Sequence, residues 1–252
     1  MKKRNFICAL CFLSMLHISA QSTQEVFKQA NEAYTKGDFA TAIQQYESLL
    51  AQGQHSEDLY YNLANAYYKT DNLGKAILNY ERALLLNPKD ENTLYNLAVA
   101  KNKMKEPIDP IPPFFLSTWW AALRGVLSPN TWAVIALVLL FLSFGALSLW
   151  QLSPNVIQKK RGFFVGLALL LAALLSFTLA WSAYWHQSDS GFAILLQDEA
   201  SLKSGADEDS QELRKIYEGT KLELIDQINI WYKVRLQNGE TGWLPGNAFE
   251  KV

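Results

Sequence analysis

The chain has 252 residues, a formal net charge of -1, and a composition that is 50% hydrophobic. Much of the apolar content lies in two long uncharged runs in the second half, and the segments around them are polar and charged. This distribution predicts a membrane protein with soluble domains, and no basic face of the kind that binds nucleic acid is present.

The N-terminus has the order of a secretory signal. A basic start is followed by an apolar stretch from Phe6 to Ile18 and by small residues before Gln21. We expect residues 1–20 to be a signal peptide cleaved after Ala20. The alternative is a retained anchor, but the stretch is shorter than the about 20 apolar residues that a spanning helix needs. Cys8 and Cys11 both lie in this segment, so the mature chain is expected to have no disulfide and no cysteine ligand.

A repeat follows, with units that start at Thr23, Glu57 and Glu91 and so recur at a constant interval. The interval equals the period of about 34 residues that is typical of the tetratricopeptide repeat, and the pattern resembles that family. It predicts an all-α repeat domain over residues 21–106, with repeats at 23–56 and 57–90 and a capping helix at 91–105. Small residues such as Ala64 and Ala76 let paired helices approach, and the lone last helix is expected to be a polar-faced cap.

The resemblance implies that the first helices of the repeats line a groove that takes a peptide or a partner helix. Asparagines at the groove positions offer both a donor and an acceptor to a peptide backbone. The alternative is that these side chains only bridge adjacent helices, and with barely two and a half repeats the groove would be shallow. The predicted partner-binding residues are Asn31, Tyr34, Tyr61, Asn62, Asn65, Tyr68, Tyr95 and Asn96.

Beyond the repeats, residues 107–128 begin with a proline-rich run that predicts an extended connector. An aromatic segment follows and predicts an interfacial helix at a membrane surface. Transmembrane helices are expected at 129–150 and 163–185, with a loop at 151–162. Gly145 and Gly166 are interpreted as isolated small residues, too few for a helix association motif.

The loop carries Lys159, Lys160 and Arg161 and no acid, which marks the cytoplasmic side. Together with the signal peptide, this predicts a two-pass protein of the bacterial inner membrane. Its N-terminal and C-terminal domains are both expected in the periplasm.

After residue 190 the sequence consists of short runs in which apolar and polar residues alternate, which predicts strands. Asn238-Gly239 is a strong signal for a tight hairpin turn. Residues 191–252, with the phrase Gly242-Trp243-Leu244-Pro245, resemble the bacterial SH3-like domain, a small all-β barrel. Core packing by Leu222, Leu224, Val234, Leu236 and Trp243 is one interpretation of its apolar residues. The other is a ligand surface formed by Trp231, Tyr232 and Trp243.

No motif nominates a catalytic residue, a metal ligand or a cofactor site. The three histidines His17, His55 and His186 are scattered, and no phosphate loop, nucleophile elbow or zinc motif occurs. We therefore expect a protein that is not an enzyme.

The domain order, from signal through repeats and two spans to the SH3-like domain, resembles the BatE-type proteins of bacterial aerotolerance (Bat) operons. The resemblance implies partnership with membrane proteins that bear von Willebrand A-type domains, and a role in envelope or oxidative-stress physiology. The first hypothesis is an assembly scaffold that binds partners through its repeats. The second is a sensor that binds peptidoglycan through the SH3-like domain. A transporter is disfavoured, because the spans contain no ionisable residue.

Overall fold

The computed structural model describes residues 23–188 and 191–252, so the predicted signal peptide lies outside the described residues. The repeat region is helical over residues 23–35 and continues with α2 (Phe39–Ala51), α3 (Glu57–Lys69), α4 (Leu73–Leu86) and α5 (Glu91–Lys101). The residue just before each of α2 to α5 caps the helix, because its side chain accepts a hydrogen bond from a backbone amide in the first turn. These caps are Asp38, Ser56, Asn72 and Asp90.

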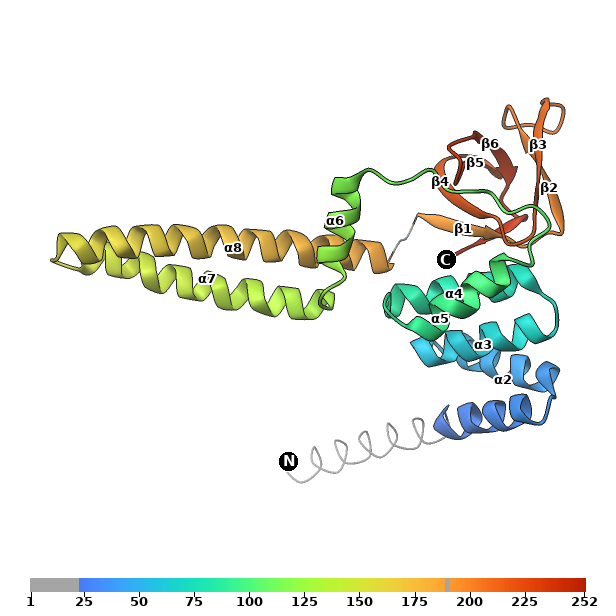
Figure 1. Ribbon diagram of the computed structural model, residues 1–252, viewed down its shortest axis with the longest axis horizontal. Coiled ribbons are helices and arrows are strands. Elements are labelled where there is room, and N and C mark those ends of the chain that lie inside the picture. Colours follow the sequence, from blue (N-terminus) through green and yellow to red (C-terminus); the bar gives the residue numbers. More distant parts are fainter. Residues whose placement is uncertain (1–22, 189–190) are drawn as a thin grey trace, which may run out of the picture. The chain divides into compact units, whose positions relative to one another are not determined.

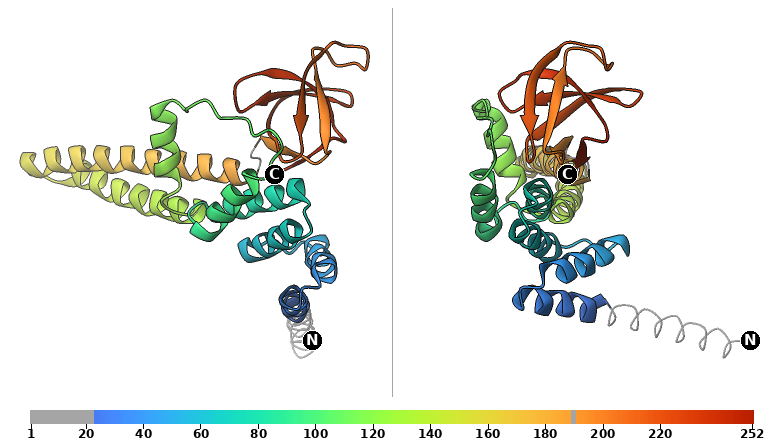
Figure 2. Two further views of the ribbon diagram at one scale, coloured as in Figure 1. Left: turned by 45° about the vertical axis from the view of Figure 1, so that its right-hand side comes forward. Right: turned by 90° about the vertical axis from the view of Figure 1, so that its right-hand side faces the viewer.

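The repeat helices stack in sequence order around one apolar core (Figure 2). Ala30, Ala42, Ala64 and Ala76 are completely buried, which allows the close approach of paired helices that the repeat requires. The predicted all-α repeat fold is therefore confirmed. The end of the stack differs from the expected polar cap, because α5 leaves Leu94 46% exposed and Tyr95 70% exposed.

A second compact unit spans residues 112–190 and contains α6 (Phe115–Arg124), α7 (Pro129–Leu152) and α8 (Val156–Ser188). Figure 1 shows α7 and α8 side by side as a long hairpin, with α6 against α8. Both long helices are apolar enough to cross a membrane, and most of their large apolar side chains are exposed, unlike those of a soluble core helix. Only residues 153–155 between them are outside a helix, so Lys159, Lys160 and Arg161 lie in the first turns of α8.

Small residues allow α7 and α8 to pack closely. A Cβ atom added at Gly162 would lie 2.8 Å from the backbone of Ala146 and Trp150, and one added at Gly166 would lie 2.7 Å from Leu147. The Ser143 hydroxyl donates a hydrogen bond to the carbonyl of Gly166 at 2.8 Å. The interpretation of Gly166 as an isolated small residue was wrong, because Gly162 and Gly166 form a Gly-x-x-x-Gly pair that packs against α7 within the chain, whereas a Cβ added at Gly145 meets nothing within 4 Å.

The C-terminal strands form an antiparallel seven-stranded sheet in the order β3-β2-β6-β5-β4-β1-β7, which confirms the predicted all-β domain. Apolar side chains that include Leu222, Val234 and Leu244 fill its core. Gly239 has φ of 85°, as the tight turn between β5 and β6 requires. The strands are β1 (Phe192–Leu195), β2 (Glu199–Lys203), β3 (Glu212–Tyr217), β4 (Lys221–Ile228), β5 (Trp231–Leu236), β6 (Thr241–Pro245) and β7 (Phe249–Lys251).

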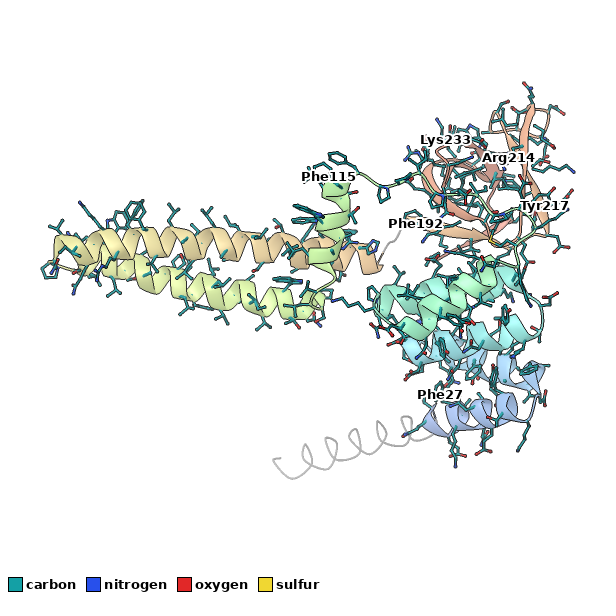
Figure 3. The ribbon with its side chains drawn as sticks, in the orientation of Figure 1. Phe27, Phe115, Phe192, Arg214, Tyr217 and Lys233 are labelled. Carbon is teal, nitrogen blue, oxygen red and sulfur yellow. The ribbon has the colours of Figure 1, made fainter. Side chains whose placement is uncertain are left out.

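The start of the proline-rich connector lies against the barrel. Glu106 pairs with Arg214 at 2.6 Å, and Ile108 packs on the barrel core. The backbone amide of Ile111 donates to the carbonyl of Gln237 at 2.9 Å. Arg214 stands on β3 in Figure 3. The connector up to Ile111 is therefore extended but attached to the barrel.

Candidate functional site

The predicted groove residues lie on the 23–35 helix, α3 and α5, where the asparagines form hydrogen bonds between helices. The Asn31 side-chain carbonyl accepts from the Tyr46 hydroxyl on α2 at 2.6 Å. It also accepts from the Asn62 side-chain amide on α3 at 3.2 Å. One asparagine therefore connects the second helix of its own repeat with the first helix of the next.

The same arrangement recurs in the following repeat. The Asn65 carbonyl accepts from the Tyr80 hydroxyl at 2.6 Å and from the Asn96 amide at 2.9 Å. The Asn96 amide also donates to the Tyr61 hydroxyl at 3.1 Å. These bonds occupy the carbonyls that were expected to meet a peptide, which matches the bridging alternative for Asn31 and Asn65.

Tyr46 and Tyr80 were missing from the predicted site, although each follows its asparagine at the same spacing and they occupy equivalent positions of successive repeats. Burial, together with a smaller contribution from the neighbouring Tyr34, raises the pKa of Tyr46 to about 12. Burial also raises the pKa of Tyr80. Both hydroxyls therefore stay protonated and remain donors to their asparagines at physiological pH.

The four predicted tyrosines, which we call the tyrosine row, lie on the first helices of the three repeat units. Tyr34, Tyr61 and Tyr68 are partly exposed and Tyr95 is 70% exposed. Burial raises the pKa of Tyr34, and Tyr61 raises it as well by a smaller amount. The Lys103 ammonium lies 4.2 Å from the centre of the Tyr68 ring. This row is the part of the predicted groove that is available for contact with a partner.

The three predicted barrel residues are divided between two faces of the sheet. Trp231 and Trp243 are diagonal neighbours on one face, because Trp231 pairs with Pro245 and Trp243 pairs with Lys233. Lys233, which lies between them on the same face by this register, is labelled in Figure 3. Tyr232 lies on the opposite face by alternation and packs edge-on against Phe249, with centroids 5.2 Å apart.

The burial of these residues corrects the packing interpretation in one respect. Trp231 is only 6% exposed, whereas Trp243 is partly exposed on the outer face. Leu244, its neighbour on β6, is the residue that enters the core. Successive residues of β6 point to opposite faces of the sheet, so only one of Trp243 and Leu244 can enter the core. The sequence motif did not show which of the two faces inward.

An open pocket of about 630 Å³ lies at the rim of the barrel beside Tyr232. Four of its lining side chains are carboxamides, each of which offers a donor and an acceptor. The lining also contains Glu208, so it suits a polar ligand that offers hydrogen-bond donors such as amide or hydroxyl groups. The carboxamides are Gln197, Gln227, Asn229 and Asn247.

A buried ion-pair cluster joins the repeats and the barrel within one compact unit. Glu81 on α4 is 9% exposed and contacts Lys101 on α5 at 2.9 Å and Lys221 on β4 at 2.7 Å. Burial opposes ionisation of Glu81, but the two ammonium groups together lower its pKa. The carboxylate is therefore charged and connects three elements.

Apolar and backbone contacts extend this junction. Ile194 on β1 is completely buried in the core of the repeats. The Glu218 carboxylate accepts from the backbone amide of Gly74 at 2.7 Å, at the start of α4, where the helix dipole favours an anion. Gly219 has φ of 84° and lies against Ile77. The barrel thus covers one face of α4.

Among residues 23–188 and 191–252, no group of histidine, cysteine and acidic side chains is arranged to hold a metal ion. The most deeply buried acid described, Glu81, is neutralised by its two lysines. The described surfaces of the repeats and the barrel are therefore considered as binding surfaces.

The fold and these surfaces define a helical repeat domain, a pair of long apolar helices and an SH3-like barrel. Residues 198–249 match the bacterial SH3 domain family. Residues 19–101 match the outer membrane lipoprotein family YfiO, a tetratricopeptide-like type. Both matched domains are of binding or scaffold types, and each match covers less than half of the chain. No curated protein matches the chain.

Proposed function

We propose that this protein is an adaptor of the bacterial inner membrane that binds partner proteins through its repeat domain. The tyrosine row carries the proposal. Four aromatic side chains from the first helices of three successive repeat units stay exposed or half-exposed, while Asn31 and Asn65 are held by intramolecular hydrogen bonds. Tyrosines with an exposed edge and hydroxyl are typical of protein interfaces.

The apolar helices support membrane attachment. α7 has 24 residues, and at about 1.5 Å per residue it is long enough for a hydrocarbon core of about 30 Å. The basic residues at the start of α8 support a cytoplasmic position for the turn between α7 and α8, by the positive-inside rule. With this topology the repeats and the barrel are in the periplasm. The interfacial role proposed for α6 is supported by Phe115 and Trp119, which are 57% and 70% exposed.

The domain order supports a place in a Bat-type aerotolerance or envelope-stress complex. In that setting the partners are membrane proteins with von Willebrand A-type domains. Attachment to the same membrane confines both partners to a plane and raises their effective concentration, so that a shallow groove is sufficient for capture.

Crosslinking of the full-length chain in intact membranes, followed by mass spectrometry, tests the proposal. The variant Tyr34→Ala with Tyr68→Ala removes two members of the row, and Tyr60→Ala on α3 is the matched control. We expect a small set of membrane proteins to be captured by the wild type and the control and to be reduced with the double variant. Failure of the wild-type chain to capture any membrane protein reproducibly would contradict the proposal.

A second candidate function is binding of peptidoglycan by the barrel. The carboxamide-lined pocket favours it, because peptidoglycan presents neutral amide and hydroxyl groups. Co-sedimentation of the full chain with purified cell wall measures it, with Gln227→Ala and Asn247→Ala combined as the pocket variant and Gln211→Ala as control. Equal sedimentation of all three proteins, or sedimentation of none, would rule out the pocket as the wall-binding site.

A further inference from the structure

The last helix of the repeat domain has an exposed face around one position that is buried in the earlier repeats. Ala30, Ala64 and Ala98 occupy equivalent positions of successive repeat units. Ala30 and Ala64 are completely buried, whereas Ala98 is exposed. Leu94 and Tyr95, one turn before Ala98, are exposed as well.

The repeat itself shows what buries this position. Ala30 on the 23–35 helix belongs to the same core as Ala42 and Tyr46 of α2, the second helix of its repeat. Ala64 on α3 is likewise buried where α4 follows. After α5 the described chain turns into the extended connector, and residues 107–111, where the pattern would begin a further second helix, contain two prolines.

We propose that the face of α5 formed by Glu91, Leu94, Tyr95, Ala98 and Asn102 binds an amphipathic helix of a partner protein, which takes the place of the missing second helix of the third repeat. Leu94 and Tyr95 each lie three or four residues from Glu91 and from Ala98, and Asn102 follows one turn later, so the five residues form one continuous stripe. The inference rests on the proposed function, that the repeats bind partner proteins. The new interface continues the packing of α2 on the first helix and of α4 on α3.

The repeat pattern specifies the chemistry of the bound helix. The second helices α2 and α4 carry a fully buried alanine, and four residues later a buried tyrosine, at Ala42 and Tyr46 and at Ala76 and Tyr80. The bound helix therefore has a small residue that meets Ala98 and a large residue one turn on. It lies antiparallel to α5, as consecutive helices of the repeat do.

One position on α5 differs from the earlier repeats and determines which type of large residue the bound helix carries. Asn31 and Asn65 accept the hydroxyls of Tyr46 and Tyr80, and the equivalent position on α5 is Val99. A valine side chain cannot accept a hydrogen bond, so a buried tyrosine hydroxyl there would lose its partner. The bound helix therefore carries an apolar residue such as leucine where α2 and α4 carry tyrosine.

A defined probe tests this inference on the full-length chain in nanodiscs. The probe is a fluorescent 14-residue peptide that copies Leu73–Leu86 of α4 with leucine in place of Tyr80. Fluorescence anisotropy compares the wild type, Ala98→Trp and Asn92→Trp. Ala98 and Asn92 are both exposed on α5, but Asn92 lies outside the stripe, so both variants are expected to keep the thermal stability of the wild type.

We expect saturable binding to the wild type and to Asn92→Trp, and binding at least about tenfold weaker to Ala98→Trp, about 1.4 kcal/mol. The same peptide with tyrosine retained should bind less tightly. Absence of saturable binding, or equal binding to Ala98→Trp, would overturn the inference.

A photocrosslinking amino acid at position 98 in intact membranes separates this inference from the proposed function. Capture of a partner at position 98, through a helix in which a large apolar residue follows a small residue by four positions, supports both the adaptor function and the α5 surface. If partners are captured by the chain but position 98 reaches none of them, the adaptor function stands and the α5 surface is wrong. Crosslinking of position 98 to a second copy of the chain would show that the α5 surface mediates self-association, and this would overturn the proposal.

Discussion

Replacement of Glu81 by glutamine tests the junction between the repeats and the barrel. The change keeps the shape of the side chain and removes the charge shared by Lys101 and Lys221. Removing one partner of a buried ion pair costs about 3 to 5 kcal/mol. The lysine side chains are 34% and 21% exposed, so water stabilises part of their unpaired charge, and we expect a loss of about 2 kcal/mol.

The assay is thermal unfolding of the full-length chain in nanodiscs. For a unit of this size, about 2 kcal/mol corresponds to a fall in Tm of about 4 to 8 °C. Hydrogen exchange measured by mass spectrometry should rise in α4 and β4 of Glu81→Gln. The control is Glu199→Gln, which removes a pair with Lys215 in which both side chains are about half exposed, and which should change Tm little.

The pH dependence gives a second check. The pKa of Glu81 is lowered in the folded protein, so its ionisation stabilises the fold above its unfolded pKa of about 4.3. That contribution is lost as the pH falls through the folded value. The difference in Tm between wild type and Glu81→Gln should therefore be largest near pH 7 and shrink below about pH 4. A fall in Tm no larger than that of Glu199→Gln, without extra exchange in α4 and β4, would refute the account of the junction.

Three further predictions concern the repeats and the apolar helices. Asn65→Ala removes the acceptor of the buried Tyr80 hydroxyl and should cost about 2 kcal/mol in thermal unfolding, whereas Asn92→Ala at an exposed position should cost almost nothing. Gly162→Val should lower the thermal stability of the α7–α8 hairpin in detergent, whereas Gly145→Val, where an added Cβ meets nothing within 4 Å, should not. A cysteine in place of Asn155 should react with an impermeant maleimide only after the inner membrane is opened, and one in place of Ser210 should react before; the reverse order would contradict the proposed topology.

The sequence was sufficient to predict the fold class, because each part has its own periodicity. The constant interval between Thr23, Glu57 and Glu91 identifies the repeats, two long uncharged runs identify the apolar helices, and alternation with Asn238-Gly239 identifies the barrel. The packing of α7 on α8 was missed because the importance of Gly162 depends on its distance to Trp150, which no local pattern contains.

The candidate site was predictable only in part. The positions of Asn31 and Asn65 follow from the repeat period, but their hydrogen-bond partners do not. Because both asparagines accept hydrogen bonds from buried tyrosines, they connect helices within the domain, although they were expected to contact a ligand directly. The junction was also missed, since Glu81 and Lys221 are 140 residues apart and each looks like an ordinary surface charge in the sequence.

The junction bears on how the two proposed binding surfaces could influence each other. Lys101 belongs to α5, the helix with the open face, and it shares Glu81 with Lys221 of the barrel. If a partner helix binds α5 as proposed, we expect it to stabilise the position of Lys101 and, through Glu81, the contact with β4. Binding at α5 and the stability of the junction would then be linked with equal strength in both directions. The buried carboxylate joins α4, α5 and β4, so loosening one of these elements is expected to cost stability in the others.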